Sequence, residues 1–186
     1  MEKSTTAQDK IVTKQETTQF RFPNADSAAE NILHQAIQFC AKKMGLEDAK
    51  AALQLLLQHN CSACQYCTYS IAQQVGETVG MLDQKVKKVY IIDYDATPED
   101  VCFAQNAQPF PIHLIVWVDQ KSSALDALLK SLNRALIQHY AELTGPCPLE
   151  YMLDTQMVDD ADVDNRIGYG AMLTSIYQCP ITVWER

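Results

Sequence analysis

The chain has 186 residues, a formal net charge of -8 and a sequence pI of about 4.9. Because phosphate contacts rely on clustered lysine and arginine side chains, this acidic balance argues against a nucleic-acid partner. The densest basic run contains only Lys85, Lys87 and Lys88, which we interpret as the solvent-exposed start of a strand. Hydrophobic residues make up 47% of the chain and charged residues 20%, a balance typical of a globular core rather than of disorder.

Two further features concern the location of the protein. A membrane-spanning helix needs a run of about 18 apolar residues, and the sequence contains no such run. The N-terminal residues also lack the apolar stretch of a secretory signal. We therefore expect no membrane partner and a cytoplasmic location. Seven cysteines in a chain of this kind predict reduced thiols rather than a disulfide framework.

The N-terminal segment differs in composition from the rest of the chain. Residues 1–24 are rich in Thr, Gln, Lys and Glu and contain few apolar side chains, so we expect a flexible polar tail. Residues 25–186 are predicted to form a single globular domain, because a chain of this length suits one core. Within it, residues 25–83 are expected to be helical and residues 84–186 to form the sheet portion.

Three helices are expected in the first half, over residues 27–44, 46–57 and 61–82. In each of them apolar residues recur at a spacing of three to four, which places them on one face of a helix. Gly45 is a typical helix stop between the first two. In the third helix, Gly76 and Gly80 favour close packing against a neighbour or a bend.

The second half alternates strands with helices. The run IHLIVWV at residues 112–118 is apolar at nearly every position, as expected of a central strand covered on both faces. Further strands are expected at residues 89–92, from Leu149 toward Val158, and at residues 181–184, with helices at 125–143 and 163–177 and a helical turn at 97–100. These elements predict an α/β (α+β) fold, in which N-terminal helices pack with a small mixed sheet of about four strands and two further helices.

The most distinctive motif is a cysteine triplet, formed by Cys61, Cys64 and Cys67. Iron–sulfur proteins repeatedly use this two-residue gap to present thiolates to a cluster, so the triplet is a candidate site for an iron–sulfur cluster or zinc. Such a site needs a fourth ligand. The candidates are His59, Cys102, Cys147 and Cys179, and each of the last two is followed by proline, as the closing cysteine of a ferredoxin motif often is.

Two other interpretations of the triplet need no metal. Cys64 and Cys67 are in phase with Ile71 and Val75, where a cysteine packs as a small hydrophobic residue, and core packing is the interpretation that we favour. Alternatively, Cys61 and Cys64 could act as a redox dithiol at a helix start, where the helix dipole stabilises a thiolate. The strand that precedes thioredoxin-like motifs is missing here.

The densest acidic run resembles the start of a calcium-binding loop. Asp160, Asp162 and Asp164 have the required spacing, but Asn165 occupies the usual glycine position and Ala171 the position of the bidentate glutamate. The run is therefore expected to be a solvated turn that caps the following helix.

The four histidines give no catalytic pattern. His113 lies within a predicted strand and is expected to be a hydrogen-bonded residue rather than a base. No catalytic role is expected for His34 or His139, which lie on predicted helices, or for His59.

The order of elements in the second half is strand, strand, long helix, acid-bearing strand, helix and closing strand. It is carried by residues 90–93, 112–119, 149–160 and 181–186. In this order the chain resembles the nucleotidyltransferase core, in which Gly-Ser follows the first strand. In that family an Asp-x-Asp pair on the next strand and a third acid hold magnesium for the transfer reaction.

This sequence departs from the family pattern at the motifs themselves. Tyr94-Asp95 stands where Gly-Ser would, and Leu114-Ile115-Val116 stands where the paired acids would. Only the third acid has a counterpart, Asp159 or Asp160, and one acid cannot hold two metal ions against a triphosphate. The resemblance therefore implies a degenerate scaffold without transferase chemistry.

The leading functional hypothesis is a non-catalytic binding or regulatory protein, possessing an α/β scaffold that engages another protein, a second copy of itself or a small ligand. One alternative is an iron–sulfur or zinc-binding redox protein that uses the cysteine triplet. Another is a structural subunit of an assembly. The absence of catalytic motifs argues against an enzyme.

Overall fold

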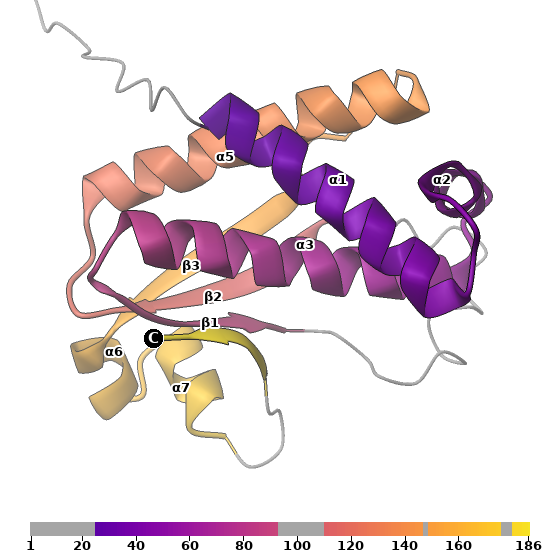
Figure 1. Ribbon diagram of the computed structural model, residues 1–186. Helices are drawn as coiled ribbons and strands as arrows, with labels where there is room; N and C mark the ends of the chain where they lie inside the picture. Colours follow the sequence, from indigo (N-terminus) through magenta and orange to yellow (C-terminus); the bar gives the residue numbers. More distant parts are fainter. Residues whose placement is uncertain (1–24, 93–109, 147–148, 176–179) are drawn as a thin grey trace, which may run out of the picture.

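The computed structural model describes residues 25–92, 110–146, 149–175 and 180–186, and Figure 1 shows their arrangement. Within these residues it contains helices and a four-stranded mixed sheet, so the predicted α+β fold class is confirmed. The polar tail and the helical turn predicted at residues 97–100 lie outside the described residues. So do three of the candidate metal ligands, Cys102, Cys147 and Cys179.

The first half of the described chain is helical, as predicted. It forms helices α1 (Ala25–Met44), α2 (Ala49–Leu57) and α3 (Cys61–Leu82). Helix α2 begins three residues later than the pattern suggested, because the Asp48 side chain accepts a hydrogen bond from the Ala51 amide and fixes the first turn there. The Asn60 side chain caps α3 in the same way, by accepting from the Ala63 amide.

The sheet contains four strands in the order β3-β2-β1-β4. They are β1 (Val86–Ile91), β2 (Ile112–Val118), β3 (Leu153–Asp159) and β4 (Ile181–Glu185). Strand β1 runs antiparallel to both β2 and β4, whereas β2 and β3 are parallel. The carboxyl ends of β2 and β3 therefore lie at the same edge of the sheet.

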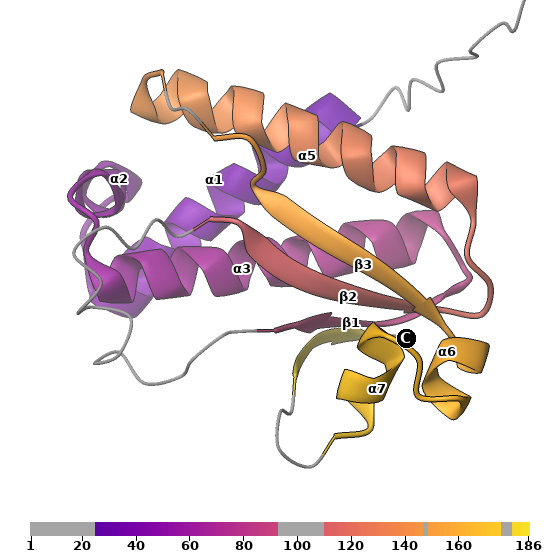
Figure 2. The same cartoon turned by 180° about the vertical axis from the view of Figure 1, so that it is seen from behind.

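Helices cover the sheet unequally. Helices α1 and α3 and the long helix α5 (Ser123–Thr144) lie over one face, while the short helices α6 (Asp160–Asp164) and α7 (Tyr169–Leu173) lie under one end of the other (Figures 1 and 2). The main core is between the long helices and the sheet and includes Leu33, Ile71, Leu114 and Leu132. A smaller cluster, formed by Ile92, Ile115, Val158 and Val163, joins the short helices to the other face.

The prediction of one continuous helix over residues 163–177 is wrong. Helix α6 ends at Asp164, and α7 begins only at Tyr169. Between them Arg166 has φ 54° and Gly168 has φ 52°, and such left-handed backbone cannot continue a right-handed helix. The apolar spacing suggested one helix because both short helices turn apolar side chains toward the same sheet face.

The predicted start of the third strand, at Leu149, is also wrong. Strand β3 begins at Leu153, and the Tyr151 side chain before it is 54% exposed. The start is fixed by Asn133 of α5, whose Oδ1 atom accepts hydrogen bonds from the Met152 amide at 3.0 Å and the Leu153 amide at 2.8 Å. A contact with a helix that lies earlier in the chain is invisible to a pattern of alternating residues.

The Asn133 contact gives a first prediction. Replacing Asn133 with leucine leaves two partly buried backbone amides without their acceptor, which should lower the free energy of unfolding by about 2 kcal/mol. Asn133→Asp retains the accepting oxygen and should remain close to wild type at neutral pH. Urea denaturation followed by circular dichroism measures both variants, and equal destabilisation of the two would show that the accepting oxygen is not what matters.

Candidate functional site

The cysteine triplet lies in the first two turns of α3, and its members have different surroundings. Cys67 is 2% exposed and Cys64 is 8% exposed, and both belong to the main core, as the favoured interpretation predicted. They pack near Cys40 of α1, whose thiol donates to the Ala63 carbonyl oxygen. The spacing of these two residues in the sequence thus reflects the buried face of a helix.

Burial also determines the protonation state of these thiols. Desolvation, followed by the proximity of Cys40, raises the pKa of Cys64 to about 11. Cys67 is more deeply buried, and its pKa is raised further by the same desolvation and by its two neighbours. Because the thiolate is both the nucleophile and the metal ligand, burial disfavours the reactive form of these residues.

Cys61 differs from the other two, because it is disulfide-bonded. The prediction of reduced thiols therefore holds for Cys40, Cys64 and Cys67 and is wrong for Cys61. The spacing of cysteines cannot reveal a pairing that depends on how distant segments meet in space.

The metal hypothesis for the triplet stays a prediction. An α-helix rises about 9 Å over the six residues from Cys61 to Cys67, so these positions are spread along an axis rather than gathered around one point. Within the described ranges, no group of three His, Cys, Asp or Glu side chains could hold a metal ion. His59, the nearest candidate fourth ligand, precedes the helix with φ 54°.

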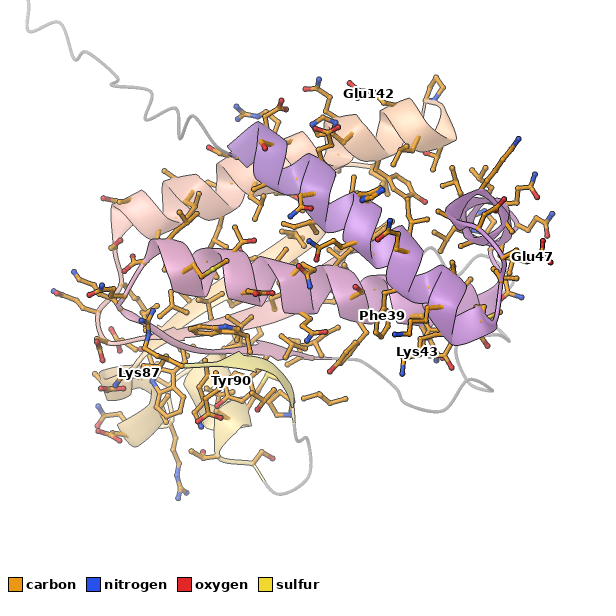
Figure 3. All side chains as sticks on the ribbon, in the orientation of Figure 1. Phe39, Lys43, Glu47, Lys87, Tyr90 and Glu142 are labelled. Carbon is orange, nitrogen blue, oxygen red and sulfur yellow. The ribbon has the colours of Figure 1, made fainter. Side chains whose placement is uncertain are left out.

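A second candidate site lies where β2 and β3 end, at the edge where parallel sheets commonly bind ligands. Here the Lys87 ammonium group of β1 lies between two carboxylates. Its Nζ atom is 2.7 and 2.8 Å from the two oxygens of Asp160 and 2.9 Å from Asp119. Trp117 of β2 donates its indole N–H to Asp160 at 2.8 Å. We call these four residues the Lys87 cluster, and Figure 3 shows Lys87 beside α6.

The electrostatics of the Lys87 cluster are mutually stabilising. Hydrogen bonds to Asp160 and then to Asp119 raise the pKa of Lys87 above its ordinary value. Hydrogen bonds from Lys87 and then from Trp117 lower the pKa of Asp160. The lysine is therefore cationic and the carboxylate anionic at neutral pH, and the ammonium group satisfies acids that could otherwise attract a metal ion.

The neighbouring acids also have internal partners. Asp159 caps α6 by accepting from the Asp162 amide at 3.0 Å, and Asp162 returns a contact to the Asp159 amide. Lys121 forms an ion pair with Asp162. The Lys121 side chain also donates a hydrogen bond to Asp162, which is the main reason why the pKa of Asp162 is lowered. The acidic run thus caps a helix, as predicted, and lysines pair with two of its carboxylates, those of Asp160 and Asp162.

His113 is hydrogen-bonded, as expected from its place in a strand. Its Nδ1 atom lies 3.0 Å from an oxygen of Asp154 on the adjacent parallel strand, and Gln156 donates to the other oxygen at 3.1 Å. These side chains lie on the sheet face opposite the long helices, beside the uncovered part of the strands.

A third candidate site is a groove of about 590 Å³ between α1 and α5, which the sequence did not suggest. The two helices cross near the start of α1 and then diverge (Figure 1). The groove is lined by Ser27, Glu30, Asn31, Leu33, His34, Ile37, His139, Glu142 and Leu143. Figure 3 shows Glu142 on α5, beside the first half of α1. We call this feature the α1–α5 groove.

His139 is the best-anchored polar side chain of the α1–α5 groove. Its Nε2 atom lies 3.0 Å from Asp26, and its Nδ1 atom lies 3.2 Å from Glu142. Its side chain is only 17% exposed, so its ring orientation is fixed by both helices. The sequence indicated that His34 and His139 lie on helices but not that the helices cross and bring them to one groove.

Comparisons with known proteins give no relative. No family model matches the chain, and neither a curated protein nor a solved structure matches it. Among the described residues, no helix is long and apolar enough to span a bilayer. The function must therefore be argued from the geometry of the candidate sites.

Proposed function

We propose that the chain is a non-catalytic binding protein built on a scaffold like a degenerate nucleotidyltransferase core. The observation that carries this proposal is the Lys87 ammonium group between Asp119 and Asp160. A nucleotidyltransferase would need divalent cations near this edge of the sheet to stabilise a triphosphate. An internal ammonium group there neutralises the available acids and supplies no Lewis acid.

The composition of β2 supports the same proposal. The strand offers Leu114, Ile115 and Val116 where the family would carry paired acids, and all three are fully buried in apolar clusters. Burial of this kind leaves no place for a carboxylate that must reach a metal ion in solvent. Asp119 and Asp160 follow β2 and β3, and Lys87 forms an ion pair with each of them.

The partner and location follow from the surface and the thiols. We propose that the chain binds a small ligand, another protein or a second copy of itself rather than nucleic acid, because its net charge is -8. We also propose the cytosol as its location, where free thiols such as those of Cys40, Cys64 and Cys67 are usual, although the disulfide of Cys61 argues the other way.

The proposal predicts that the purified chain does not transfer nucleotides. Incubated with ATP, Mg²⁺ or Mn²⁺ and varied acceptors, it should form no covalent nucleotide product, measured with labelled ATP. Lys87→Ala should raise the affinity for Mn²⁺, measured by electron paramagnetic resonance of the free ion, because it frees Asp119 and Asp160.

Lys88→Ala is the matched control for this experiment. Lys88 is the next residue of β1 and forms an ion pair with Glu185 at 2.7 Å, away from the Lys87 cluster. Its loss should leave Mn²⁺ affinity unchanged. Nucleotide transfer by the wild-type chain above a no-protein blank would refute the non-catalytic proposal. An equal effect of both lysine variants on Mn²⁺ affinity would show that the Lys87 cluster does not control metal binding.

A further inference from the structure

We propose that the α1–α5 groove is a binding site for a small organic cation, namely an amine with an apolar body. This inference rests on the proposed binding function and gives it a ligand class. The groove volume of about 590 Å³ suits a small molecule, since such pockets usually measure roughly 300–1,000 Å³. Neither the Lys87 cluster nor the cysteine triplet contributes a residue to it.

The charge of the lining selects the sign of the ligand. Glu30 and Glu142 line the groove, Asp26 reaches it through His139, and the lining residues that the structure describes include no lysine or arginine. Two of these carboxylates are partly satisfied, because His139 contacts both Asp26 and Glu142 and because Gln138 also donates to Glu142. A cation entering the groove would therefore meet carboxylates for which no ammonium or guanidinium group among the described lining residues competes.

Glu30 is the carboxylate that we expect to contact the ligand. Within the described part of the chain it has neither a hydrogen bond nor an ion pair, unlike Asp26 and Glu142. It lies on the exposed side of α1, one turn before His34, so its side chain can move to meet an ammonium group without breaking an existing contact. A ligand ammonium group would gain a charge-assisted hydrogen bond there.

The apolar part of the lining selects the body of the ligand. Leu33 and Ile37 are buried and belong to the main core, so they form a fixed floor. Leu143, at the opposite wall, is 44% exposed, so an apolar group bound in the groove would remove part of its surface from water. An alkyl or aromatic body would bury this side chain while its amine faces Glu30.

Three matched probes separate charge from shape. Hexylammonium, hexanol and hexanoate share one alkyl body and differ in their head group. In isothermal titration calorimetry on the full chain, hexylammonium should bind more tightly than hexanol, and hexanoate should bind most weakly. Binding should also shift the NMR signals of the His139 ring, because this ring lies at the groove. Equal binding of all three would overturn the ligand class, and no binding of hexylammonium would overturn the site.

Two variants localise the binding. Glu30→Gln should weaken hexylammonium binding by roughly fivefold and leave hexanol unaffected, as expected for an exposed charge pair. Glu77→Gln removes the same charge from an exposed position of α3 outside the groove and should have no effect, which controls for general attraction to an acidic protein. An equal loss in both variants would overturn the proposal. Failure of this test would leave the nucleotide-transfer result standing, so the two proposals can fail separately.

Discussion

Replacing Gly80 with alanine should destabilise the protein by about 3 kcal/mol, although alanine is the better helix former. A Cβ atom at Gly80 would lie 2.2–2.7 Å from three atoms of the Trp184 ring. The ring cannot easily withdraw, because its Cβ end is held against Gly76 of the same helix and Arg186 lies over its face. Urea denaturation followed by circular dichroism should show the loss as a lower midpoint.

Two variants test whether the Trp184 contact is the cause. Glu77→Ala changes an exposed residue of the same helix and should alter stability by less than about 0.5 kcal/mol. In a Trp184→Leu background, Gly80→Ala should cost much less than in the wild type, because the ring that it meets is gone. Additive effects of the two changes would show that the strain arises elsewhere.

The helices of this fold could be predicted because their signals are local. Each of α1, α2 and α3 has its apolar residues on one face and a stop or cap within a few residues of its end. For Gly80 the sequence predicted either close packing or a bend, and the structure shows close packing, but its partner was not predicted. Trp184 lies on a strand at the other end of the chain, and a glycine indicates that something approaches without indicating what.

The Lys87 cluster and the α1–α5 groove were harder to predict, because both depend on contacts between distant segments. Lys87 was interpreted as a solvent-exposed strand residue, whereas it bridges acids that follow β2 and β3. The α1–α5 groove exists only because two helices far apart in the sequence cross. The cysteine triplet, by contrast, was assigned correctly to the core at Cys64 and Cys67 from periodicity alone.

The cysteines give the second large expected effect, which is on chemical reactivity. At pH 8, alkylation of Cys64 by iodoacetamide should be about a hundredfold slower in the folded protein than in urea. A pKa of about 11 instead of 9.0 reduces the thiolate fraction by that factor. Cys67 should react more slowly still, because it is more deeply buried. Mass spectrometry of the labelled peptides measures each site separately.

An exposed cysteine on the same helix provides the control. Glu77→Cys should react at the rate of a free thiol in the folded state, which would show that α3 itself does not suppress alkylation. Rapid alkylation of Cys64 or Cys67 in the folded protein would contradict the core interpretation.

The same cysteines separate packing from metal binding. If Cys61, Cys64 and Cys67 ligated an iron–sulfur cluster, anaerobically purified protein would absorb near about 400 nm, and Cys64→Ser would abolish that absorption. We expect instead a colourless protein, because the buried Cys64 and Cys67 thiols hold their protons well above neutral pH and Cys61 is bonded to another sulfur. The conclusion would be reversed if the wild-type protein contained stoichiometric iron or zinc and the Cys67→Ala variant did not. A residue that only packs in the core would not change the metal content.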